Sequence, residues 1–183
     1  MKRLAVLLAL VLVQACDAPW AGPTLPDGGH WVSFNTISYE GPRVITNDIF
    51  AASTTAELES AVLAFETSRH PGYRLDQACP APCWGPVPAS QPGLLYLAVA
   101  TMADGCGDTR VKEGAAMAGR TLYFIHWVGV RSGSRCLAAQ DARWRLLSVS
   151  TRDLPGSGTL TVRLQLQGSN SNANAAEGRV DLT

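Results

Sequence analysis

Cysteine and histidine are the side chains in this sequence with the widest chemical repertoire. The chain has five cysteines and three histidines, and four of the cysteines come after residue 70: Cys79, Cys83, Cys106 and Cys136. Cys79 and Cys83 are four residues apart and His70 precedes Cys79 by nine, a spacing that zinc and copper sites accept. Four cysteines are equally the number that two disulfides require. The choice depends on the compartment in which the chain folds.

The first fifteen residues have the pattern of an export signal. Lys2 and Arg3 form a basic start, and the ten residues 4–13 are all apolar. This run is too short to span a bilayer, because a spanning helix needs roughly 20 apolar residues. Val13-Gln14-Ala15-Cys16 follows and resembles the lipobox of bacterial lipoproteins. The resemblance implies cleavage before Cys16, a diacylglyceryl thioether on its sulfur, and acylation of the new amino group by a chain such as palmitate.

A lipid on Cys16 determines the expected location of the protein. One buried acyl chain gives marginal membrane binding, whereas two or three chains anchor a protein stably. We therefore expect a protein of the bacterial cell envelope that is lipid-anchored to a membrane, does not span it, and faces the extracytoplasmic side. The alternative is a soluble secreted protein in which Cys16 has no such role.

Export favours disulfides over free thiols, because bridges form outside the cytoplasm. Four cysteines allow three pairings. We favour Cys79 with Cys83, which closes a proline-rich loop, and Cys106 with Cys136, whose longer loop makes that bridge worth about 3 to 4 kcal/mol. The alternative is a metal site formed by His70, Cys79 and Cys83, which needs reduced thiols. No cofactor motif is present, and none is expected to bind.

The sequence offers no recognisable catalytic motif. It lacks Gly-x-Ser-x-Gly, His-Glu-x-x-His and a phosphate-binding glycine loop. His126 lies in the middle of a predicted strand, where a core histidine with hydrogen-bond partners is more typical than a general base. We expect a protein that is not an enzyme, and a hydrolase without a known motif is one alternative.

The charge pattern argues against nucleic acid as a partner. Loss of residues 1–15 removes Lys2 and Arg3, which leaves 13 basic residues against 15 acidic residues and a net charge near −2. A phosphate-binding surface needs clustered lysine and arginine, whereas these residues are scattered along the chain.

The elements that must position these residues are mostly short β-strands. Thr54-Thr55-Ala56-Glu57 is a capping box, which predicts one helix that ends before His70-Pro71-Gly72. The fold class we expect is α+β, with a mostly antiparallel β-sheet or sandwich and one packed α-helix. Apolar runs and alternation predict strands at residues 31–34, 43–46, 94–100, 121–128, 143–149 and 160–166. Residues 160–166 alternate between apolar and polar side chains, which predicts one wet, solvent-facing side, whereas 94–100 is apolar on both faces, as a covered central strand would be.

The chain divides into four expected parts. They are a lipoprotein signal peptide at 1–15, a proline- and glycine-rich tether at 16–29, a single mainly β domain at 30–167, and a flexible tail at 168–183. Residues 179–182 in that tail can add a last edge strand. Trp31, Trp127 and Trp144 lie in strand patterns and are expected in the core.

The proline-rich segment 79–93 is the part best suited to contact a protein partner. A stiff, disulfide-closed loop that presents Trp84 has the properties of a preorganised aromatic anchor. The alternative is that Trp84 covers the edge of the core.

The order of elements resembles the PrcB-like domain, named for a lipoprotein subunit of a bacterial protease complex. The matching pieces are Ala56-Glu57-Leu58, residues 95–99, Gly105 with Gly107, and residues 136–155. The resemblance implies a non-catalytic, partner-binding lipoprotein and assigns no site residues. We therefore expect a binding or accessory role in the cell envelope, with an envelope metal-binding protein as the main alternative.

Overall fold

The computed structural model describes residues 22–37, 47–67, 87–106, 109–130, 136–168 and 173–182. These ranges are mostly β-strand with a single α-helix, which confirms the expected mainly β class. The elements in chain order are β1 (His30–Val32), β2 (Phe34–Ile37), β3 (Asp48–Ala52), α2 (Thr55–Thr67), β4 (Leu94–Cys106), β5 (Thr109–Ala118), β6 (Thr121–Val130), β7 (Cys136–Ser150), the 3-10 helix η1 (Thr151–Asp153), β8 (Gly158–Gly168) and β9 (Ala173–Leu182).

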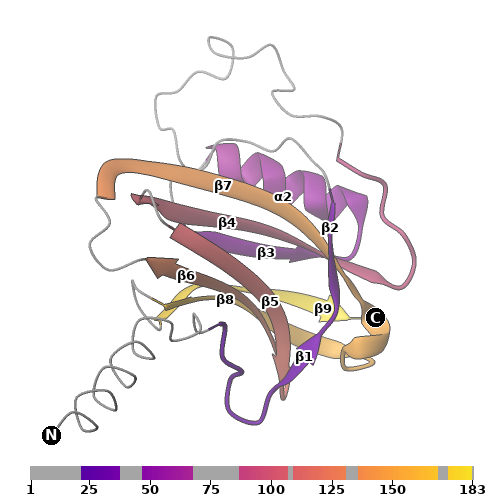
Figure 1. Ribbon diagram of the computed structural model, residues 1–183. Coiled ribbons are helices and arrows are strands. Elements are labelled where there is room, and N and C mark those ends of the chain that lie inside the picture. Colours follow the sequence, from indigo (N-terminus) through magenta and orange to yellow (C-terminus); the bar gives the residue numbers. More distant parts are fainter. Residues whose placement is uncertain are drawn as a thin grey trace, which may run out of the picture.

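The strands form two sheets that pack face to face (Figure 1). Sheet A has the order β1-β5-β6-β8-β9, and sheet B has the order β2-β7-β4-β3. Neighbouring strands are antiparallel except for β6 and β8, which are parallel. Parallel neighbours need a long connection, and here β7 supplies it by crossing through sheet B.

The main core lies between the two sheets, and alternate residues of each strand reach it. In β8 the inward residues are buried while the residues between them are half-buried, which confirms the predicted wet face. In β4, residues 95–100 are at most 2% exposed on both sides, which confirms the expected central strand. The largest contributions to this core come from Ile49, Leu95, Leu97, Leu122, Phe124, Leu147, Leu160 and Leu164.

Helix α2 covers the outer face of sheet B (Figure 1). It begins at the predicted capping box, where the Glu57 N–H donates to Thr54 Oγ1 at 3.2 Å and Glu57 Oε2 accepts the Thr54 N–H at 3.2 Å. Leu58 is buried beneath the helix against Tyr96 and Leu146. This second apolar layer explains why β4 is buried on both faces.

The sandwich is closed along its two sides by different means. On one side only Ser33 separates β1 from β2, so the chain passes directly from the edge of sheet A to the edge of sheet B (Figure 1). On the other side β9 approaches β3 so closely that a Cβ on Gly178 would lie 3.1 Å from the Ile49 carbonyl oxygen. A glycine at this position lets the two edges meet.

Strand β5 was not predicted from the sequence. Gly114, Ala115 and Ala116 occupy its centre, and both residue types are depleted in strands. These small residues suit the position, because a Cβ on Gly114 would come within 2.6 Å of the Trp31 ring. The Trp31 prediction was wrong: Val32 takes the inward position of β1, so Trp31 points outward and is 47% exposed.

The two ends of the described chain are more ordered than their composition indicates. Strand β9 begins at Ala173, within the segment expected to be a flexible tail, and Ala175 and Ala176 pack against the core. Thr24 is hydrogen-bonded to Gln167 of β8, within the segment expected to be a tether. The described residues include no helix with the length and apolar character that a bilayer crossing demands.

Candidate functional site

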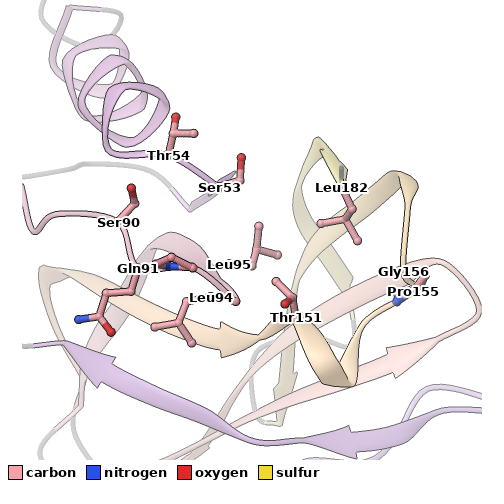
Figure 2. Close-up of a pocket in the computed structure, with 12 residues that line it drawn as sticks. Ser53, Thr54, Ser90, Gln91, Leu94, Leu95, Thr151, Pro155, Gly156 and Leu182 are labelled. Carbon is pink, nitrogen blue, oxygen red and sulfur yellow. The ribbon is translucent and has the colours of Figure 1, made fainter.

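A cavity of about 430 Å³ lies at one end of the sandwich, which we call the pocket end (Figure 2). It is within the size range of small-molecule sites, about 300 to 1,000 Å³. Its wall combines the turn before α2, the turn before β4, the segment around η1 and the end of β9 (Figure 2). The residues that line it are Ser53, Thr54, Ser90, Gln91, Pro92, Gly93, Leu94, Leu95, Thr151, Pro155, Gly156 and Leu182.

The wall formed by residues 90–94 is held in place from three sides. The Ser90 N–H donates to Thr55 Oγ1 at 2.6 Å, and the Gln91 N–H donates to the Tyr96 hydroxyl at 2.9 Å. Gly93 has a φ of 80°, which allows the turn that returns the Leu94 N–H to the Gln91 carbonyl oxygen at 3.3 Å. The wall is therefore preorganised by hydrogen bonds that its main-chain N–H groups donate.

The opposite wall is fixed by the carboxylate of Glu57. Its Oε2 accepts the Ser53 N–H at 2.7 Å and the Ser53 hydroxyl at 2.9 Å, besides the Thr54 N–H. The hydrogen bond from the Ser53 main chain is the largest cause that lowers the pKa of Glu57 below its ordinary value. Glu57 thus acts from outside the cavity, by holding Ser53 and Thr54 at its rim.

The described residues that line the cavity include no ionisable side chain. Its polar groups are the hydroxyls of serine and threonine, one amide and main-chain groups, and its apolar groups are leucine and proline. General acid–base catalysis needs a titratable side chain within hydrogen-bond reach of the substrate, and a serine nucleophile needs a base. This lining is suited to hold an uncharged group by shape and hydrogen bonds.

Three charged or polar side chains meet between the sheets toward the other end, which we call the charged end. Glu113 of β5 and His126 of β6 are register partners, and Glu113 Oε1 lies 2.9 Å from His126 Nδ1. The same oxygen forms an ion pair with Nη1 of Arg145, which comes from β7 in the other sheet. His126 is 1% exposed, and the side chains of Glu113 and Arg145 are 19% and 15% exposed. One carboxylate therefore ties the two sheets together.

The alternation of the strands explains why these groups face inward. Glu113 has the same parity as core residue Ala115, and Arg145 is the register partner of core residue Val99. Thr101 follows Val99 on the same face and is fully buried, and its hydroxyl has no hydrogen-bond partner among the described residues. Burial lowers the pKa of Arg145 from its ordinary value, a cost that the Glu113 carboxylate offsets.

The contacts described at the charged end join one carboxylate to two nitrogen-bearing side chains. Glu113 is shared between His126 and Arg145. His126 is a buried residue of β6 whose Nδ1 contacts this carboxylate.

Most residues singled out in the sequence lie outside the described ranges. Two of the four predicted disulfide positions, Cys106 and Cys136, are described, and they are Cα partners at the end of the β4–β7 ladder. Within the described ranges no three His, Cys, Asp or Glu side chains are grouped as a metal site would require. The residues and segments that lie outside are Cys16, residues 43–46, His70, Pro71, Gly72, Cys79, Cys83 and Trp84.

Comparisons of this chain with protein-family models, with curated proteins and with solved structures found no match. The cavity and the charged cluster were both missed by reasoning from the sequence. An indication for Arg145 was present in the sequence, because this residue has the same parity as the apolar residues Leu147 and Val149. No such indication was present for Glu113, since β5 was not recognised as a strand.

Proposed function

We propose that this protein is a non-catalytic binding or accessory protein of the bacterial cell envelope, anchored to a membrane through a lipid on Cys16. The observation that carries the binding part is the cavity at the pocket end, whose described lining is preorganised and combines hydroxyl, amide and apolar groups. The lipobox pattern at 13–16 supports the membrane part.

The position of the cavity relative to the proline-rich loop supports the same proposal. Residues 79–93 are the segment best suited to contact a partner, and the described end of this segment, residues 90–93, forms one wall of the cavity. A partner that contacts residues 90–93 therefore also reaches the cavity. The described lining residues offer no counter-ion, which favours an uncharged group in the cavity.

The test is site-specific photo-crosslinking in cells. A photoreactive residue replaces Gln91, which is exposed at the cavity wall, and a second one replaces Glu59, which is exposed on α2 away from it. We expect a discrete crosslinked product from position 91 and none of the same mass from position 59. Equal labelling from both positions would refute binding at the cavity.

A blocking variant sharpens this test. A Cβ at Gly156 would meet no atom within 4 Å, so Gly156→Trp adds a large side chain to the lining without a clash at its base. Ser157→Trp is the matched control, because Ser157 is the exposed neighbour and is not part of the lining. Crosslinking from position 91 is expected to fall about ten-fold in Gly156→Trp and to persist in Ser157→Trp.

The anchor is tested separately by mass. Intact protein purified from membranes is expected to begin at Cys16 and to carry two or three acyl chains, and Cys16→Ser is expected to carry none. A mature protein without acyl chains would refute the anchor and leave the cavity result standing.

A further inference from the structure

Two exposed apolar side chains stand out in β1 and in the segment that precedes it. Leu25 and Trp31, at 40% and 47% exposure, are the exposed large apolar side chains among the described residues. The Trp31 ring rests on β5 at Gly114, where the absence of a side chain makes room for it. One side of the ring is packed and the rest faces solvent. A large ring with one polar N–H suits the boundary between lipid and water.

The segment that carries these residues is fixed to the sheet. The Thr24 N–H donates to Gln167 Oε1 at 2.7 Å, and Gln167 Nε2 donates back to the Thr24 carbonyl oxygen at 2.9 Å. A turn then returns the Gly29 N–H to the Pro26 carbonyl oxygen at 2.9 Å and leads into β1. Leu25 and Trp31 are therefore presented from defined positions.

Two basic side chains of the described residues lie on the same face of sheet A as Trp31. Arg110 and Lys112 are exposed and lie on the outer face of β5, and Lys112 Nζ is 5.5 Å from the centre of the Trp127 ring. Asp27, in the turn, is the acidic side chain of residues 22–37. On β9, at the opposite edge of the sheet, Glu177 is neutralised by Arg163 at 2.7 Å. Arg110 and Lys112 have the sign of charge that an anionic surface attracts.

The proposed lipid lies close to the same face. Thr24 follows Cys16 by eight residues, which span at most about 29 Å when fully extended. Because Thr24 is bonded to sheet A, the chain from the lipid reaches the domain on the side that presents Leu25 and Trp31.

We propose that the outer face of sheet A around Leu25, Trp31 and Lys112 lies against an anionic phospholipid surface. This inference rests on the proposed lipid anchor and adds an orientation to it. Helix α2 covers the opposite outer face of the sandwich, so it points away from the membrane (Figure 1). The helix layer is then the side that remains open to the extracytoplasmic space.

The experiment uses the full mature chain in vesicles of phosphatidylethanolamine and phosphatidylglycerol that contain a spin-labelled lipid. Quenching of tryptophan fluorescence is compared between the native protein and Trp31→Phe, so that the difference isolates Trp31 from the other tryptophans. Intact mass reports the acyl chains on Cys16 in the same sample. We expect Trp31 to be quenched, and equal quenching in the two proteins would overturn the proposal.

Charge reversal provides a second readout on unlipidated Cys16→Ser protein. Lys112→Glu is expected to lower its affinity for the anionic vesicles about ten-fold at low salt. Arg152→Glu is the matched control, because Arg152 is exposed on η1 at the pocket end. Equal effects of the two reversals would overturn the proposal, as would a dimer in lipid-free solution that Trp31→Phe converts to a monomer.

The two proposals fail differently. If Cys16 carries no acyl chain, the anchor is refuted, and the vesicle affinity of the unlipidated protein alone decides the orientation. If Cys16 is acylated and Trp31 is not quenched, the anchor stands and the orientation is refuted.

Discussion

The two ends of the sandwich carry opposite chemistry. At the pocket end, hydroxyls, an amide and leucines surround an open space of about 430 Å³. At the charged end, Glu113, His126 and Arg145 contact one another between the sheets. An end whose charged side chains contact one another across the core is suited to hold the sheets together, whereas an end with preorganised walls and open space is suited to bind.

The comparison indicates that the charged end is suited to stabilise the domain and that the pocket end is suited to bind. Glu113 joins β5 to both β6 and β7, so its carboxylate links the sheets across the core. Ser53 and Thr54 are instead held by Glu57 within one local turn. Changes at the charged end should therefore act on the whole domain, and changes at the pocket end should act locally.

The largest expected effect concerns Cys106 and Cys136. Opposite residues in an antiparallel ladder have Cα atoms about 4.5 to 5.5 Å apart, which a disulfide can bridge. We predict this bridge, and we predict that the Cys106→Ser, Cys136→Ser double variant loses about 3 kcal/mol of unfolding free energy in urea. A non-reducing peptide map that finds both thiols free would contradict it.

The next effect tests the ion pair between the sheets. Glu113→Leu leaves Arg145 buried without its counter-ion and is expected to lower the free energy of unfolding by about 2 to 3 kcal/mol, measured by urea denaturation. Glu177→Leu is the control, because it removes the carboxylate of the more exposed pair with Arg163 and should change stability little. Similar losses in both variants would mean that the charged end does not link the sheets.

A smaller effect is expected at the seam, the place where the edge strands β3 and β9 meet at Ile49 and Gly178. Gly178→Ala adds a Cβ 3.1 Å from the Ile49 carbonyl oxygen and 3.2 Å from Val162 Cγ2, so the edges must move apart. The expected cost is about 1 to 2 kcal/mol in thermal or urea unfolding. Gly156→Ala is the control, because a Cβ there meets no atom within 4 Å. An increase in the stability of Gly178→Ala would show that the seam has space for the added methyl group.

The smallest effect concerns the rim of the cavity. The lowered pKa of Glu57 means that its carboxylate adds stability above its ordinary pKa of 4.5, and this is lost as the pH falls through the lowered value. Glu57→Gln should cost less than about 1 kcal/mol at pH 7 because the group is exposed. The difference in unfolding free energy between Glu57→Gln and the native protein should become smaller below pH 4.5. A difference that becomes larger there would contradict the assignment.

Residues with a strong local pattern allowed correct predictions. The capping box at Thr54 fixed the start of α2, and the alternation in residues 160–166 identified the wet face of β8. The run 94–100 identified a central strand, although β4 continues to Cys106. In each case the signal lies within a few neighbouring residues, where periodicity and capping act.

The features that were missed depend on residues far apart in the sequence. Gly114 in β5 makes room for the ring of Trp31, which lies 83 positions earlier in the chain, and no local pattern indicates that contact. The cavity takes its lining from segments as distant as Ser53 and Leu182. Such sites follow from the order of strands in the sheets, which alternation alone does not determine.

The passage of one strand from sheet A to sheet B at Ser33 has a mechanical consequence. A pull on the N-terminal side of the domain first loads the hydrogen bonds between Thr24 and Gln167, and then the ladder between β1 and β5. Since β1 continues into β2, peeling β1 away transmits tension directly to the ladder between β2 and β7. A pulling force on the N-terminal side of the domain is thus resisted by hydrogen bonds in both sheets, because β1 and β2 are consecutive and belong to different sheets.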